Sequence, residues 1–460
     1  MGLIDRLLIK RLDKLLKERS VGSQVYGELL KNVQNRPVYF TDNIDSYVKE
    51  GYLYNPLVYS IVSFIAQKAS SIPWGVYEVK SDKALQLYKS ANRYDFSKRV
   101  IKTKALIEIK DHELSQLFIT PNNLQGWAEF CEQVMGFKLV TGNSYIQCMS
   151  PTSGLNKGLV RELWHIPTQI IHPVAGDRTT PVKGYQYLQE RDLIPVDQII
   201  HLKYWTPEYW NGAFLLGLSP IRAAKRIVTK SNSSYDSFVS SFQNMGAYGI
   251  ISGDSKTDDQ MLTEEQAEKI EERFRRKTGP KNWGKPIITS AALKWQQMGM
   301  SPVDLNIIES DKMDLRSLCS VYHVPSELFN DASNKTYSNT KEAGSAVYTN
   351  AVLPALNQLR DAFNLFINPR YEGKVYVDYD ASMISELQDD LNYMTQALSG
   401  AWWLTPNERR DMMNFGMDEK NTLMDEYWLP VGLSPITGAG IDDEAIEEAA
   451  KRLGINDYKQ

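Results

Sequence analysis

The sequence is poor in cysteine. Its 460 residues include only Cys131, Cys148 and Cys319, which are far apart and form no CxxC pair. An odd and scattered set favours neither a disulfide framework nor a metal site built from thiolates. The cysteine content therefore fits a reducing compartment.

Long apolar runs are also missing. The most apolar stretch, residues 57–66, has the length of a core helix and falls short of a bilayer span. Met1–Ser20 carries six basic and three acidic side chains between leucines and isoleucines, which predicts a basic amphipathic helix. We interpret it as an ordinary packed or frayed helix rather than a membrane contact, because Arg6 occupies the Ser/Thr position of a myristoylation signal. The sequence thus predicts a soluble protein with no membrane partner.

The signatures of enzymes are absent as well. The sequence has no Ser/His/Asp order, nucleophile elbow or zinc-binding helix. Gly279–Lys285 matches half of a phosphate-binding loop, but Pro286 stands where a hydroxyl would hold Mg²⁺, and a helix is expected before the loop. We therefore expect no cofactor and no catalytic residue, and we interpret Lys281 and Lys285 as surface charges.

Candidate metal ligands are not grouped in the sequence. His165, His172 and His201 each lie alone among apolar residues of predicted strands, so we interpret them as structural. The adjacent acidic pairs at 389–390 and 442–443 would point about 100° apart on a helix. A metal-dependent nuclease is accordingly the least favoured hypothesis.

The chain is organised around a helix, a polar loop and a second helix between residues 301 and 367. Ser301 and Pro302 have the residue types of an N-cap and a first helical turn, and Pro325 would end this helix. Its apolar side chains recur at helical spacing on one flank. The other flank is acidic and carries Asp304, Asp311 and Asp314.

The loop at Asn330–Asn339 has almost nothing to bury. Asn339 or Thr340 is predicted to cap the second helix, and Pro354 is predicted to kink it. The composition of the loop is compatible with an idle surface connection and with a finger presented to a partner.

Another long helix is predicted from Ser219-Pro220 to about Met245. One face of it is basic and carries Arg222, Lys225, Arg226 and Lys230. This face is either solvated or meets the acidic flank of the 301–323 helix, within one subunit or between subunits. Between the two helices, residues 246–299 predict a small βαβ-like module whose helix begins at a capping box, Thr263–Gln266.

The remaining segments mix short strands with helices, which indicates an α+β domain over roughly 50–210. Residues 21–54 predict an extended arm, and the lysine-rich residues 81–110 predict an irregular insertion that ends in one strand. After a returning strand in "GKVYVDYD", a capping box at Thr405–Glu408 predicts a further helix.

Several phrases resemble the portal proteins of tailed bacteriophages. They are "TGNSYI", "LWHIP", "GLSPI", "HVPSELF", "TYSNTKEAG", "VYTNAVLPALNQL" and "SGAWWLTPNERR". The resemblance covers roughly residues 50–430. It implies an α+β subunit with a mixed wing, a two-helix stem, a small α/β clip insert and a helical crown, which assembles into a ring.

The resemblance also implies how the chain is divided. A basic helix and arm (1–50) precede the wing (51–215), the first stem helix (216–245), the clip (246–299), the second stem helix (300–323) and the channel loop (324–340); the wing helix with its returning strand (341–385), the crown (386–430) and an acidic tail (431–460) follow.

As a portal subunit, the chain would form a ring, usually a dodecamer, at one capsid vertex through which double-stranded DNA is packaged and later ejected. The implied partners are further copies of the chain, DNA, the terminase large subunit, a head–tail adaptor, and the major capsid and scaffold proteins, in the virion and, during assembly, in the host cytoplasm. The loop would face DNA with Asn330, Ser333, Asn334, Lys335, Thr336 and Tyr337, the three stem aspartates would line the channel wall, and Lys281 and Lys285 would lie on the clip surface. The alternative is a non-portal ring or head–tail adaptor, also structural.

Overall fold

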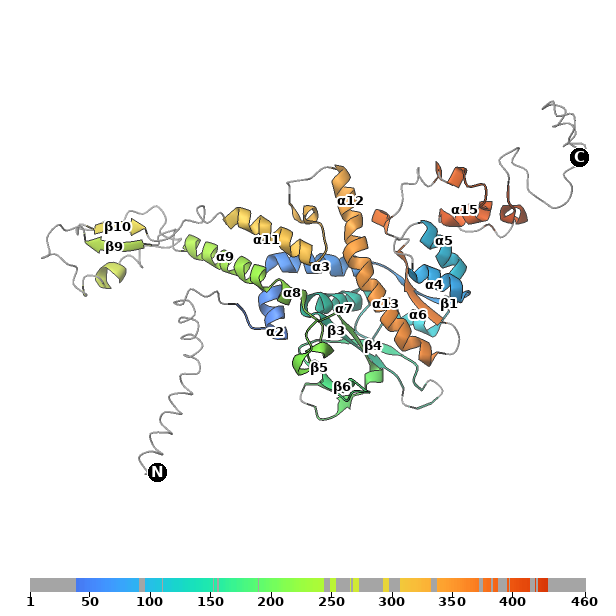
Figure 1. Cartoon of the computed structure of the whole chain (residues 1–460), viewed down its shortest axis with the longest axis horizontal. Coiled ribbons are helices and arrows are strands. Elements are labelled where there is room, and N and C mark those ends of the chain that lie inside the picture. The colour runs from blue at the N-terminus through green and yellow to red at the C-terminus, as the bar shows by residue number, and fades with distance from the viewer. Residues whose placement is uncertain are drawn as a thin grey trace, which may run out of the picture. The chain divides into compact units, whose positions relative to one another are not determined.

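The computed structural model describes residues 39–90, 96–109, 111–151, 153–154, 157–188, 190–243, 249–253, 265, 268–272, 293–297, 307–331, 337–371, 375–381, 384–387, 395–396, 398–413, 418 and 421–428. The chain divides into two compact units (Figure 1). The first comprises Met1–Ser71 and Gln116–Arg370, and the second comprises Ile72–Ser115 and Tyr371–Gln460. Both combine helices with antiparallel strands, which confirms the α+β prediction.

The core of the first unit lies between two helices and a three-stranded sheet. α3 (Pro56–Ser70) packs against α7 (Trp127–Thr141), which leads directly into β3 (Asn143–Met149). β3 is the central strand and pairs in antiparallel fashion with β4 (Glu162–Ile166) and β8 (Ile199–Lys203). These five elements lie within the α+β domain that was predicted over roughly residues 50–210.

A second antiparallel sheet of the first unit follows in the order β5 (Ile171–Ala175), β6 (Val182–Tyr187) and β7 (Leu193–Ile194). Side chains from both sheets share one buried cluster that includes Tyr145 and Tyr185. β7 was not predicted, since two residues are too few for an alternating pattern to show.

Two histidines of the first unit pack against aromatic rings. The ring of His165 stacks on Phe137 with 4.7 Å between centroids, and that of His201 stacks on Tyr145 at 4.4 Å. Burial lowers the pKa of His165 to about 4. Burial, with a smaller effect of Lys203, lowers the pKa of His201 to about 3. Both rings are therefore neutral at pH 7, which suits a structural role.

The predicted helix from residue 219 to 245 is divided in two. Ser219 accepts a hydrogen bond from the N–H of Arg222, and Pro220 occupies the first turn, which confirms the predicted start of α8 (Pro220–Ala223). Ala224, with ψ of 8°, separates α8 from α9 (Lys225–Gln243). One non-helical residue hardly changes the spacing of apolar side chains, so the sequence pattern does not reveal this break.

α11 (Ile307–Val321) packs along α9. Beyond the polar loop, α12 (Tyr337–Val347) continues through a π-helical segment, η8 (Tyr348–Val352), into α13 (Leu353–Ile367). Pro354, in the first turn of α13, has no N–H to continue the α-helical hydrogen-bond pattern, and the π-helical segment ends directly before this turn. α12 begins at Tyr337, two to three residues before the predicted caps.

Residues 44–53 are helical, which corrects the prediction of an extended arm at these positions. α2 (Ile44–Ser46) leads into a π-helix, η1 (Tyr47–Leu53), which packs on α3, α7 and α8 of the same chain. A Cβ on Gly51 would lie 2.7 Å from two carbons of Ile221, so this glycine allows η1 to approach α8.

The second unit contains a three-stranded sheet in the order β11 (Val375–Tyr379), β1 (Trp74–Val79) and β2 (Leu106–Glu108). β11 is the returning strand, and it was predicted. The insertion predicted for residues 81–110 does end in a strand, β2, but it is not irregular before that strand, because α4 (Asp82–Ser90) and α5 (Phe96–Ala105) are regular helices. A non-local contact helps to hold α4, as the buried Tyr88 donates a hydrogen bond of 2.6 Å to Asp378.

The capping box predicted near the end of the chain is confirmed. The N–H of Thr405 donates to Glu408 Oε2 at 3.0 Å, and the N–H of Glu408 donates to Thr405 Oγ1 at 3.2 Å, at the start of α15 (Pro406–Met412). The shorter elements are α6 (Glu113–Leu117), η2 (Val196–Gln198), η3 (Trp210–Leu215), η6 (Ser326–Phe329), η9 (Asn368–Arg370), η11 (Ser385–Leu387) and η12 (Thr422–Asp425). None of the helices within the described ranges is long and apolar enough to cross a bilayer.

The insert between α9 and α11 contains β9 (Gly249–Gly253) and β10 (Leu293–Gln297), which form an antiparallel pair. Two of the predicted strands are therefore present, whereas the βαβ-like arrangement also needs the strand predicted near Pro286 and stays a prediction. Residues 268–272 are helical, as predicted. The capping box at Thr263 and the strand predicted near Pro286 lie outside the described residues.

Replacing His165 with phenylalanine should reduce the loss of stability in acid. The unfolded chain binds a proton at this position below about pH 6.5, whereas the folded chain does so only near pH 4. The free energy of unfolding is therefore highest above pH 6.5, and it decreases as the pH falls towards 4, by at most about 1.4 kcal/mol per pH unit. We expect the melting temperature of His165→Phe to exceed that of the wild type more at pH 5 than at pH 7.5. His172→Gln, which changes an exposed ring, is the control, and equal pH slopes for His165→Phe and wild type would contradict the argument.

Candidate functional site

The candidate site is the corner at which α8 and α9 leave the sheets of the first unit. α7 ends at Gly142, whose φ of 78° is left-handed and whose N–H donates to the carbonyl of Lys138 at 2.9 Å. A Cβ on Gly142 would lie 2.5 Å from the backbone of Leu218, so the segment before α8 runs directly against the start of β3. Glycine is required here both for its φ and for the space.

Asn143 ties the two segments together. Its Oδ1 accepts a hydrogen bond of 2.7 Å from the N–H of Gly217 and lies 3.1 Å from His201 Nε2. Its Nδ2 donates to the carbonyls of Thr141 and Gly217 at 3.1 and 3.3 Å. The side chain is only 2% exposed, so both ends of the amide are satisfied inside the protein.

Ser219 adds a third tie, since its Oγ donates to the carbonyl of Val140 at 2.6 Å while accepting from the N–H of Arg222. The segments "TGN" and "GLSP", more than seventy residues apart, thus meet at one corner that sets the direction of α8.

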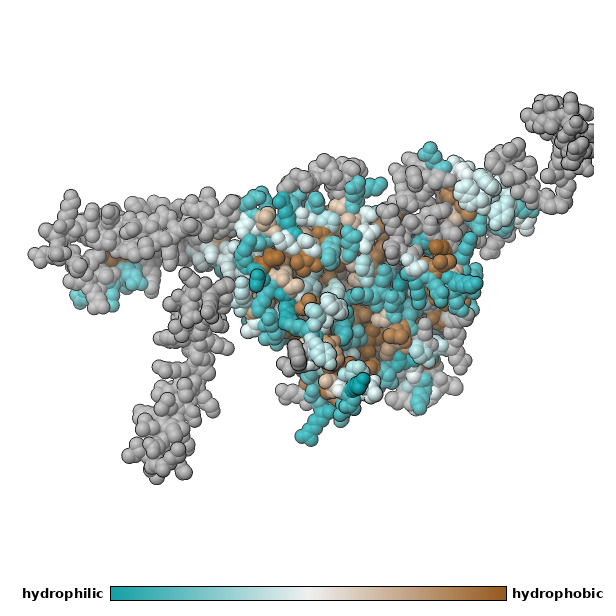
Figure 2. Space-filling view, viewed as in Figure 1, coloured by the Kyte–Doolittle hydropathy of each residue, from teal (hydrophilic) through white to brown (hydrophobic). Residues whose placement is uncertain are grey.

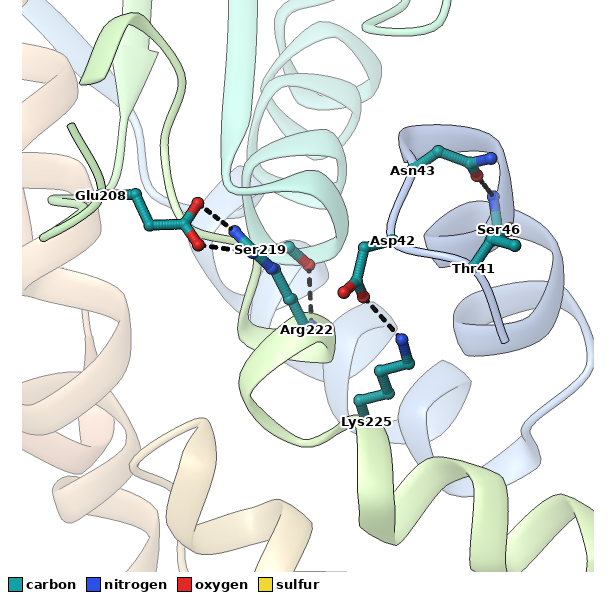
Figure 3. A network of polar contacts seen from close by, with 8 residues as sticks. All are labelled: Thr41, Asp42, Asn43, Ser46, Glu208, Ser219, Arg222 and Lys225. Carbon is teal, nitrogen blue, oxygen red and sulfur yellow. Dashed lines mark hydrogen bonds and ion pairs between the residues drawn. The ribbon is translucent and has the colours of Figure 1, made fainter. Parts of the chain in front are cut away.

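Two of the predicted basic residues pair with acids outside the 301–323 helix (Figure 3). Arg222 makes a bidentate pair with Glu208 at 2.7 and 2.6 Å. That hydrogen bonding lowers the pKa of Glu208. Lys225 Nζ lies 2.8 Å from Asp42 Oδ1, and Arg226 is exposed. The basic face therefore mainly anchors the start of α9 to neighbouring segments of its own chain.

The predicted meeting of opposite charges does occur once between α9 and α11, within one chain. Lys230 Nζ lies 2.7 Å from Asp314 Oδ1, and Tyr235 donates a hydrogen bond of 2.9 Å to Asp311. Burial raises the pKa of Asp314 despite the opposing effect of Lys230. Asp314 is 4% exposed, so it is not on an open face from which it could line a channel, and Asp304 lies outside the described residues.

The root of the polar loop is fixed to α11. Asn330 is left-handed with φ of 65°, and Asp331 is 8% exposed. Arg316 binds Asp331 through Nε at 2.6 Å and Nη2 at 2.8 Å, and Ser326 donates to the same carboxylate at 2.9 Å. Such a bidentate pair holds direction as well as position.

Most of the other residues predicted for the loop are not among the described residues. Ser333, Asn334, Lys335 and Thr336 lie outside the described residues, as do Lys281 and Lys285, and Tyr337 begins α12. In the sequence, Asp331 looks like any other polar residue of the loop. The only signal of its ion pair is an arginine on the preceding helix.

A family model for phage portal proteins matches residues 56–414. The chain belongs to the phage portal protein family. An uncharacterized protein of Rickettsia bellii (strain RML369-C) is 27% identical over 369 residues, which cover 78% of this chain and 86% of that protein.

Two solved structures share the fold. A chain from the neck of an empty gene transfer agent (GTA) particle, computed with C6 symmetry, matches with a TM-score of 0.59 and 23% identity over 83% of this chain and 96% of that chain. A chain from the neck of the native GTA particle, computed with C12 symmetry, matches with a TM-score of 0.55 and 22% identity over the same shares. The resemblance inferred from the sequence is thus confirmed.

The portal family is structural, in agreement with the lack of catalytic motifs in the sequence. In the part of the chain that the structure describes, no three His, Cys, Asp or Glu side chains are placed to hold a metal ion. The exposed His172 lies 3.1 Å from Gln186, which accounts for the third histidine of the predicted strands.

Gly142→Ala should destabilise this portal-family chain strongly. Gly158 provides a matched control, because its φ of 83° is equally left-handed but nothing lies within 4 Å of an added Cβ. We expect Gly158→Ala to cost about 1–2 kcal/mol from backbone strain alone. Gly142→Ala should cost at least about 2 kcal/mol more, because backbone atoms of Leu218 must move. Urea unfolding measures both, and equal losses would show that the close approach is unimportant.

Arg316→Ala should lower the melting temperature, because the buried carboxylate of Asp331 loses two charge-assisted hydrogen bonds. Lys312→Ala on the same helix removes an exposed pair with Glu309 and should change stability by less than about 0.5 kcal/mol. Thermal unfolding of both variants tests the anchoring of the loop root, which would be refuted by indistinguishable melting temperatures.

Proposed function

We propose that this chain forms a closed ring at one capsid vertex, through which double-stranded DNA is packaged and later ejected. The family match over residues 56–414 carries the proposal. The likeness to neck chains, one of them from a particle computed with C12 symmetry, supports a dodecamer. The virion vertex is then the location of the assembled ring, after assembly in the host cytoplasm.

The division into parts is proposed on the same basis. α8, α9 and α11 form the stem, and the insert at 246–299 forms the clip, which would dock the terminase large subunit and later a head–tail adaptor. The two units contribute the wing, whose outer side would meet the major capsid and scaffold proteins, and residues 386–430 contribute the crown. A non-portal ring or adaptor is less favoured, since the family match extends over both units.

The polar loop is proposed to face DNA in the channel. The structural support is its root, where Arg316 fixes Asp331, the last described residue before the loop. These residues include one lysine, Lys335, between polar side chains. One positive charge per subunit attracts phosphate weakly, which allows DNA to move past without being trapped.

The purified chain should form closed rings. Heterologous contacts between copies close only when the rotation between neighbours permits it, and twelve copies are the expected number. Mass measurement by light scattering across concentration and salt, with electron microscopy of the same samples, checks this. A chain that stays monomeric under all conditions would contradict the proposal.

Lys335→Glu should impair the packaging or retention of DNA while rings assemble normally, because substitutions within a polar loop sequence usually change folding stability little. Lys312→Glu, on the exposed side of α11, is the charge-matched control and should leave packaging unchanged. The readout is the fraction of DNA-filled heads. Normal yields of stable full heads from Lys335→Glu, with Asn334 and Tyr337 also changed to alanine, would show that the loop does not face DNA.

A further inference from the structure

The described surface contains an apolar groove between η1 and α7, with a volume of about 330 Å³. η1 contributes Val48, Tyr52 and Leu53 to its walls, and α7 contributes Gly136, Phe137 and Val140. Leu53 is 71% exposed, which is unusual for a leucine beside other apolar side chains. Figure 2 shows hydrophobic residues reaching the surface over the region where Figure 1 places α3, the helix next to η1.

The floor of the groove contains a glycine within a long helix. Gly136 lies inside α7, where glycine costs about 1 kcal/mol relative to alanine. A Cβ at this position would meet nothing within 4 Å, so packing inside the described chain does not demand glycine. A segment seated closely on α7 would explain why the helix carries no side chain there.

The rim of the groove is acidic. Glu129 and Glu132 line it, one turn apart on α7. A matching segment therefore needs an apolar stripe for the walls and basic side chains beside that stripe.

We infer that the groove holds the amino-terminal segment Met1–Ser20 of the same chain. On a helix, Ile4, Leu8, Leu12 and Leu15 fall on one face, and six basic against three acidic side chains give the segment a positive charge. Eighteen residues, 21–38, separate this segment from Tyr39, where the described chain begins, and a flexible chain of that length spans about 23 Å on average. Tyr39 is only nine residues before Val48 in the groove wall. Such a tether gives an effective concentration in the millimolar range, which favours the chain's own segment over another copy. The inference goes beyond the portal role and does not depend on it.

Disulfide trapping in the full-length chain tests the inference. The native thiols Cys131, Cys148 and Cys319 are buried, so cysteines introduced by Leu8→Cys and Gln133→Cys can be oxidised selectively. We expect a linked monomer, identified by mass spectrometry, to form about tenfold faster than with Leu8→Cys and Gln198→Cys, whose second site is exposed elsewhere in the same unit. Equal rates would overturn the inference, and linked dimers in place of linked monomers would assign the groove to a neighbouring copy and overturn it too.

Two further substitutions separate docking from folding. Gly136→Leu fills open space with a better helix former, so the melting temperature should not fall while the trapping rate falls to that of the Gln198 control. Glu132→Lys should lower the trapping rate by up to about fivefold, the effect of one exposed ion pair. Unchanged trapping in Gly136→Leu, with the fold intact, would show that the segment lies elsewhere.

Discussion

The hydrogen bonds between Asn143 and Gly217 are the constraint on which the rest of the first unit depends. They join the start of the central strand to the segment that leads into α8, and Gly142 leaves no room for either backbone to shift. α9 continues from α8, α11 packs along α9, and the loop root is bound to α11. The corner formed by Gly142, Gly217 and the amide of Asn143 therefore sets the direction in which the polar loop starts, because α8, α9 and α11 connect the two places.

The sequence was informative where structure is decided by neighbours along the chain. Ser219 with Pro220, and Thr405 with Glu408, gave correct helix starts because a cap and its partner lie within one turn. The same reasoning could not find that Tyr88 holds α4 through Asp378, almost three hundred residues away. It also could not decide that β9 and β10 are antiparallel, since strand direction depends on how the chain between them returns.

The charges of the candidate site show the same limit. The basic face of α8 and α9 and the acidic flank of α11 were both visible in the sequence, and Lys230 with Asp314 bears out their attraction. Arg222 and Lys225, however, pair with Glu208 and Asp42, which no helical period connects to them. These charges are therefore satisfied within one chain, whereas Arg226 and the 81% exposed Trp205 remain on its described surface.

The burial of Asp314 also changes how a channel through such a ring would guide DNA. A wall lined by three aspartates per subunit would repel phosphate over its whole length, but Asp314 is enclosed and Asp311 accepts a hydrogen bond from Tyr235. Carboxylates engaged in this way project less field into a channel than free ones. Centring of the DNA would then depend less on repulsion by the wall and more on the position of the loops, each held at its root by Arg316 and Asp331. In the proposed channel, a root fixed by Arg316 with one lysine in the sequence beyond it would suit that task, because a single positive charge per subunit attracts phosphate only weakly.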